Sequence, residues 1–188
     1  MNVPIHRLIY PFKTAWDRGT TEQVPARWHG VNFYYILSSE GGPEPIYNVA
    51  PLLKTRLAAF LEEAHRRFHV VGINHIGVYQ DRPVSNLTTA SSSHAFGQAF
   101  DITGFQFSDG SVAKVKNRAN LHIATRLQPI VALLRQHFDV VSDWCADPKR
   151  HGDHLHAEVE GFRSLSESVF IRICVFCSGR AVHWWERV

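Results

Sequence analysis

The sequence lacks the long apolar runs of a membrane protein. No stretch of its 188 residues approaches the roughly 18 consecutive apolar residues of a transmembrane helix. The opening segment, MNVPIHRLIYPFKTAW, has neither an apolar h-region nor a small-residue cleavage site, so we expect no signal peptide in this chain. Runs of Lys and Arg are also missing, and nothing therefore indicates a nucleic-acid partner.

Cysteine is scarce, and its few copies form no metal or disulfide framework. Cys145, Cys174 and Cys177 are an odd number, and with no signal peptide expected this count argues against structural disulfides. The Cys174 and Cys177 pair has the spacing of metal ligands, but a closed zinc site needs a second pair, which the chain lacks. Histidine, with twelve copies, is unusually frequent.

The apolar patterns predict an α+β domain with a small antiparallel sheet flanked by helices. Branched and aromatic residues or alternating patterns predict strands, in order along the chain, at 31–38, 73–80, 98–105, 111–116, 138–144 and 154–160. Helical spacing predicts two helices, at 51–68 and 119–137. We expect an N-terminal arm packed on the domain at 1–45, the domain itself at 46–162, and a C-terminal tail at 163–188.

Each predicted helix has one apolar stripe that should face the core. In the first helix the stripe consists of Leu53, Leu57, Phe60, Leu61 and Ala64. In the second it consists of Leu121, Ala124, Leu127, Ile130, Val131 and Leu134.

Three histidines and an aspartate crowd into HGDHLH, residues 151–156. Side chains repeat every two residues along a strand, so His154 and His156 should share a face. Either both imidazoles bind a metal, or one binds it and the other acts as a base. Gly152 lets the chain bend and bring His151 near, and Asp153 is placed to accept a proton from a neighbouring ring and fix its tautomer.

A second unusual stretch is SSSHAFGQAFDITGF, residues 91–105. Asp101 should lie on the strand face opposite Phe100 and Ile102. Gly97 permits a tight turn, so His94 and Asp101 can converge from either side of it. If the last strand pairs beside this one, His156 completes a set of three ligands with one open position, which is the pattern of a catalytic zinc site.

These two stretches resemble the signatures of the zinc D-alanyl-D-alanine carboxypeptidase and murein endopeptidase family, the LAS metallopeptidases. HGDHLH is similar to the family's H-x-x-H-x-H ending, and DITGFQFSDG is closest to the extensin-like C-terminal branch. The resemblance spans roughly residues 50 to 160. The stretch at residues 91–105 contains the family's other motif, S-x-H-x-x-G-x-A-x-D. Every fixed position of this motif is matched, by Ser92, His94, Gly97, Ala99 and Asp101.

The resemblance implies an LAS/Hedgehog-like zinc peptidase fold in which His94, Asp101 and His156 bind Zn²⁺. His154 would be the catalytic base, with His151 assisting or orienting it. Many relatives have an acidic residue at the place of His154, and this chain departs from them there. Arg82, twelve positions before His94, would stabilise the oxyanion.

The function that this resemblance implies is zinc-dependent hydrolysis of peptidoglycan stem or cross-link peptides containing D-amino acids, by a carboxypeptidase or an endopeptidase. The protein would act at the bacterial cell wall, as a phage lysis enzyme or an exported protein. One alternative is a non-catalytic zinc-binding module of the extensin-like type, which binds cell wall or a protein partner. Another is a different zinc hydrolase, such as an amidase, with a similar site.

Overall fold

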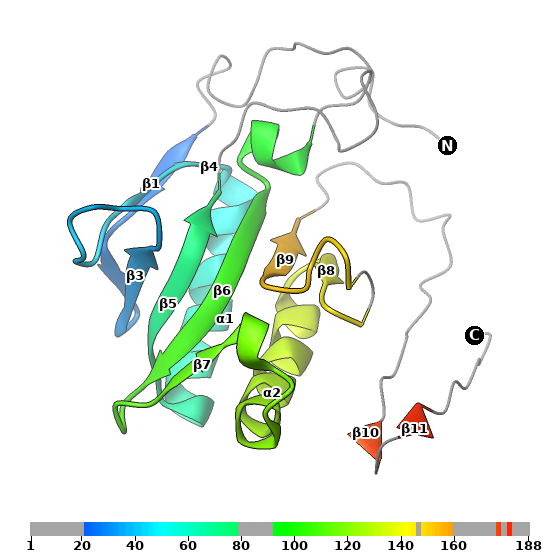
Figure 1. Cartoon of the computed structure of the whole chain (residues 1–188). Helices are drawn as coiled ribbons and strands as arrows, with labels where there is room; N and C mark the ends of the chain where they lie inside the picture. Colours follow the sequence, from blue (N-terminus) through cyan, green and yellow to red (C-terminus); the bar gives the residue numbers. More distant parts are fainter. Residues whose placement is uncertain (1–20, 79–91, 146–147, 160–175, 178–179, 182–188) are drawn as a thin grey trace, which may run out of the picture.

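The described residues form a mixed α+β fold dominated by strands (Figure 1). The computed structural model describes residues 21–78, 92–145, 148–159, 176–177 and 180–181. Within these ranges, neither α-helix has the length and apolar character needed to cross a membrane. The predicted α+β class is confirmed.

The main sheet has seven strands in the order β2-β3-β5-β6-β9-β8, and β7 pairs with β6 outside this path. Every pairing is antiparallel except that of β3 with β5, which is parallel. The predicted antiparallel sheet is therefore correct except at this pair, where a crossover containing a helix returns the chain to the end of the sheet at which β3 began. The strands are β2 (Arg27–Trp28), β3 (Val31–Tyr35), β5 (Val70–Gly77), β6 (Ala99–Phe107), β7 (Val112–Lys114), β8 (Val140–Ser142) and β9 (Leu155–Glu158).

Two smaller pairings lie outside the main sheet. β1 (Glu22–Val24) pairs with β4 (Ile46–Val49), and β10 (Phe176–Cys177) pairs with β11 (Arg180–Ala181). Strands β1, β2 and β3 fall within the segment that we assigned to an N-terminal arm. Because β3 is an interior strand of the main sheet and contributes the buried Phe33, this part of the segment belongs to the core.

Helix α1 (Pro51–Phe68) begins with Pro51 in its first turn, where a missing N–H costs no hydrogen bond. The five residues of its predicted apolar stripe are all buried, so that prediction is confirmed. In Figure 1, α1 lies behind β5 and β6. It thereby covers one face of the centre of the sheet.

Helix α2 (Leu121–His137) begins after Asn120, whose side chain accepts hydrogen bonds from the backbone N–H groups of His122 and Ile123. The predicted stripe is confirmed from Leu127 onward. Leu121, however, is 79% exposed, because it is the first residue after the cap and precedes the turns that reach the core. The buried residues of α2 are Leu127, Ile130, Val131, Leu133 and Leu134.

A candidate metal centre

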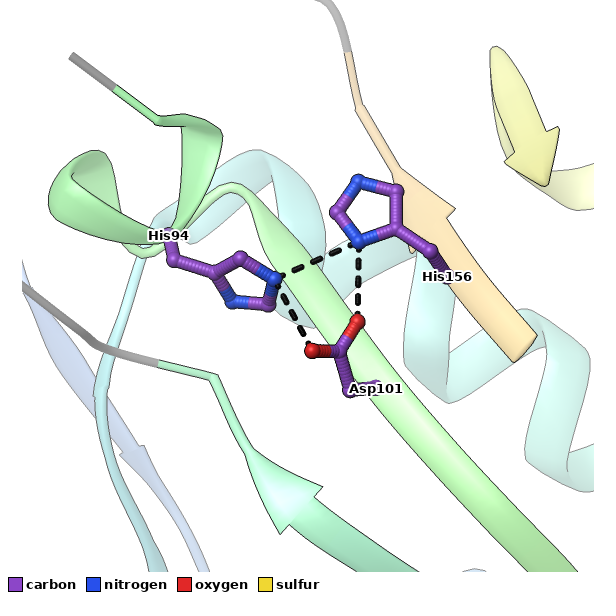
Figure 2. A group of neighbouring side chains, drawn as sticks. All are labelled: His94, Asp101 and His156. Atoms are coloured by element: carbon purple, nitrogen blue, oxygen red, sulfur yellow. Dashed lines mark hydrogen bonds and ion pairs between the residues drawn. The ribbon is translucent and has the colours of Figure 1, made fainter. Parts of the chain in front are cut away.

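Three side chains from three separate elements converge at one end of β6. His94 comes from the short 3₁₀ helix η2 (Ser93–Phe96), Asp101 from β6 and His156 from β9. Figure 2 shows the three side chains pointing toward one another. His94 Nε2 lies 3.2 Å from Asp101 Oδ2 and 3.2 Å from His156 Nδ1, and the last atom lies 2.8 Å from Asp101 Oδ1. The cluster could hold a metal ion.

The strand register brings Asp101 beside His156. β6 and β9 are antiparallel neighbours, and these two residues are directly opposite each other. Cross-strand neighbours on one face lie close together, as their side chains do here. Phe100 and Ile102, on either side of Asp101, belong to the hydrophobic core instead. The predicted alternation of β6 is confirmed, and the last predicted strand does pair beside it, which was the condition for His156 to join the set.

The turn at Gly97 places His94 over the start of β6. Gly97 has a φ of +64°, in the left-handed region that favours glycine. A Cβ at this position would collide with the carbonyl oxygen of Asn48, at the end of β4. Ala50 N donates a hydrogen bond to the Gly97 carbonyl at 2.9 Å. The turn is therefore fixed against the junction of β4 and α1, and only glycine fits it.

The two imidazoles of the cluster present different nitrogens. His94 Nδ1–H donates to the carbonyl oxygen of Val78 at 2.7 Å, which leaves Nε2 toward Asp101. His156 has the reverse arrangement, because its Nε2 donates to Glu158 Oε2 at 3.3 Å and its Nδ1 faces Asp101. Each ring thus has one nitrogen occupied by an acceptor and the other directed at the centre.

Charge is strongly coupled within the cluster. Burial opposes ionisation of Asp101, but hydrogen bonds from His156 and His94 outweigh it and lower the pKa of this carboxyl. Burial likewise opposes the charged form of His156, but hydrogen bonds to Asp101 and Glu158 raise its pKa to about 9. Asp101 is thereby kept ionised although its side chain is only 4% exposed, and the buried anion is compensated by the positive charge on the His156 imidazole beside it.

His154 lies beside the cluster, on the same side as His156. Its Nδ1 donates to Asp153 Oδ1 at 2.8 Å, as predicted for a carboxylate that fixes the tautomer. The Nε2 lone pair is consequently free to accept a proton, 4.0 Å from Asp101 Oδ1. The His151 ring lies against that of His154, with centroids 5.1 Å apart. Arg82, which was predicted to stabilise the oxyanion, lies outside the described residues.

Sequence reasoning missed Glu158 and Ser93, which contact each other beside the cluster. The Ser93 hydroxyl donates to Glu158 Oε1, and Glu158 Oε2 accepts from His156. A signal for Glu158 was present, since a residue two positions after His156 lies on the same strand face. Arg118 was missed as well, and it donates to the carbonyl of Gly152 in the loop between His151 and His154.

Comparison with known protein families finds a match over the centre of the chain. The family described as extensin-like protein C-terminus matches residues 48–167, which is more than half of the chain. The matched region contains the whole cluster. No curated protein and no solved structure matches the chain.

Proposed function

The chain belongs to the extensin-like protein C-terminal family, and on that premise we propose that it is a zinc-dependent peptidase of peptidoglycan. Its substrates would be stem or cross-link peptides containing D-amino acids. The observation that carries the proposal is the convergence of His94, Asp101 and His156 on one point. We also propose that this chain has the LAS/Hedgehog-like zinc peptidase fold, because the motifs of both stretches follow the pattern of that group.

The donor set and its spacing suit zinc. Two imidazole nitrogens and a carboxylate oxygen are ligands of catalytic zinc sites, which keep a fourth position open. With bonds of about 2.0 Å in a tetrahedral site, neighbouring ligand atoms lie roughly 3.3 Å apart. Here the two nitrogens are 3.2 Å apart and approach different oxygens of Asp101, at 3.2 and 2.8 Å, so a shift of the carboxylate would present one oxygen beside both nitrogens. Zinc, when bound, supplies Lewis acidity for hydrolysis.

We assign the general base to His154. Its Nε2 faces the cluster with a lone pair, while Asp153 holds the proton on Nδ1. In this position the ring can take a proton from the attacking water and return it to the leaving amine. His151 would orient the His154 ring by packing against it. In the same proposal Arg82 stabilises the oxyanion.

We place the activity at the bacterial cell wall, either as a phage lysis enzyme or as an exported protein. A net charge of +3 suits binding to an anionic wall polymer. The partner would be the peptidoglycan peptide itself.

Metal analysis and a peptidoglycan assay test the proposal together. We expect the purified chain to hold about one zinc ion and to release new amines from purified peptidoglycan, with loss of release in chelator. Asp101→Ala and His156→Ala should lose both zinc and hydrolysis. His122→Ala, at an exposed position of α2, is the control and should retain both. Mass spectrometry of the digested muropeptides would identify the bond cleaved.

Two results would go against the proposal in different ways. Bound zinc without amine release would favour the non-catalytic module that binds cell wall or a protein partner. A folded chain that takes up no divalent metal would contradict the zinc site altogether.

A further inference from the structure

Glu158 lies on the far side of His156 from Asp101. It follows His156 by two residues on β9, and its side chain is only 13% exposed. One carboxylate oxygen accepts from His156 Nε2 at 3.3 Å, and the other accepts from the Ser93 hydroxyl. The nearly buried carboxylate is therefore bonded to a residue of the cluster on one side and to the η2 turn on the other.

The contact with His156 determines which nitrogen of that ring faces the cluster. A neutral imidazole carries its hydrogen on one nitrogen and its lone pair on the other. A neutral ring that donates Nε2–H to Glu158 has its Nδ1 lone pair available to a metal on the side of Asp101 and His94. For His94 the backbone carbonyl of Val78 has the same effect. His156 has a side-chain acceptor in that role, which a mutation can remove.

The contact with Ser93 joins the two segments that carry the histidines. Ser93 immediately precedes His94 in η2, whereas Glu158 belongs to β9, so the bond connects segments 65 residues apart in the sequence. Backbone hydrogen bonds support the same junction, since Val159 N donates to the Gln98 carbonyl at 2.9 Å. One carboxylate thus affects both the orientation of His156 and the placement of the turn beneath His94.

We infer that Glu158 is a positioning residue for metal binding. It holds His156 with Nδ1 toward the metal and, through Ser93, fixes the separation of the two histidine ligands. This inference rests on the proposed function, because it takes the cluster to be a zinc site. Outer carboxylates that orient a ligand histidine commonly change metal affinity by about 10- to 100-fold when they are removed.

The test measures the zinc dissociation constant of the full chain by competition with a chromophoric chelator. Glu158→Ala should bind zinc about 10- to 100-fold more weakly than wild type. Glu158→Gln should lose less, because its amide oxygen can still accept the His156 Nε2–H. Ser93→Ala should show a smaller loss than Glu158→Ala, since the carboxylate itself remains. Glu158→Gln and Ser93→Ala also keep the test decisive if Glu158→Ala does not fold.

Glu63→Ala is the matched control. Glu63 also accepts a hydrogen bond from a histidine, His137 Nε2 at 3.0 Å, but this pair joins α1 and α2. Its zinc affinity should stay at the wild-type value. Nitrogen-15 NMR of the zinc-loaded protein adds a readout that a general loss of stability would not change. His156 should be the Nε2–H tautomer in wild type and should lose that single state in Glu158→Ala.

The inference and the proposed function fail in different ways. If wild type binds zinc and a folded Glu158→Ala variant matches its affinity and its His156 tautomer, Glu158 has no positioning role, while the zinc site stands. If wild type binds no zinc, the proposed function and the inference built on it are both overturned.

Discussion

At the scale of single residues, the partner of each imidazole decides what the ring can do. Val78 and Glu158 accept from one nitrogen of His94 and His156, and the other nitrogen of each ring faces Asp101. The acceptor for His154 is Asp153, and its Nε2 stays 4.0 Å from the same carboxylate. Two of the three histidines, His94 and His156, thus each direct a ring nitrogen into the cluster, and the third, His154, lies beside it.

This division predicts the result of replacing His154. Because its ring is outside the ligand cluster, His154→Gln should retain zinc but lower kcat by roughly 10²- to 10⁴-fold, the usual contribution of a general base. Zinc content and peptidoglycan hydrolysis are the measurements. His122→Gln, at an exposed position of α2, should change neither. Full activity would exclude His154 as the base, and loss of zinc would make it a ligand.

At the scale of elements, β6 organises the site. It pairs with β5 on one edge and with β9 and β7 on the other. Its register with β9 sets the distance between Asp101 and His156, while the turn before it sets the position of His94. The turn depends on Gly97, which lies against the Asn48 carbonyl at the end of β4.

Gly97 and Gly110 have similar backbone conformations but different surroundings. Comparing an alanine substitution at each therefore separates the cost of the contact with Asn48 from the cost of the backbone conformation. Gly97 and Gly110 both have positive φ, +64° and +80°, but a Cβ on Gly110 would meet nothing within 4 Å. Gly110→Ala should therefore cost only the left-handed backbone penalty, roughly 1–2 kcal/mol. Gly97→Ala adds a collision with fixed backbone, and we expect about 1–3 kcal/mol more. Urea unfolding of both variants measures the difference.

Zinc affinity gives a second readout on the same pair. It should fall in Gly97→Ala, which displaces His94, and stay unchanged in Gly110→Ala. Equal unfolding free energies and equal zinc affinities for the two variants would show that the close approach at Gly97 has no energetic weight.

At the scale of the whole molecule, one polar ring is buried in the core. His75 on β5 is 3% exposed and packs among aromatic rings, with its centroid 5.2 Å from that of Phe100. Within the described part of the chain, neither of its ring nitrogens has a hydrogen-bond partner. Burial therefore lowers the pKa of His75 to about 4, from 6.5.

This burial predicts that the fold weakens in acid. Between pH 6.5 and pH 4 the unfolded chain binds a proton at His75 that the folded chain does not, so stability falls as the pH falls through this window. The shift corresponds to about 3 kcal/mol between pH 7 and pH 4. His75→Phe should remove this part of the pH dependence, because phenylalanine does not titrate.

Urea unfolding at pH 7, 5.5 and 4 tests this prediction for wild type, His75→Phe and the exposed control His122→Gln. The control should follow wild type at each pH. If His75→Phe loses as much stability in acid as wild type does, another group is responsible for the loss.

Local pattern was enough to predict the helices and most of the strands. The stripe of α1 was correct at every position because a long amphipathic helix has a strong period, and Pro51 marks its start. Leu121 failed because periodicity does not say where along a helix the core begins. The sequence did not predict that β3 and β5 pair in parallel, because the relative direction of two strands depends on the path of the chain between them.

By itself the sequence determined which residue types stand at which spacing: a His, Gly and Asp around one turn, and three histidines before a strand. From these it indicated the three members of the cluster. Only the tertiary structure decided which nitrogen each ring presents, because that choice depends on acceptors such as Val78 and Glu158 that folding brings into contact. The bond from His94 to Val78 joins residues 16 apart in the chain, and the spacing of His156 and Glu158 predicts only that they share a strand face, not that they bond to each other.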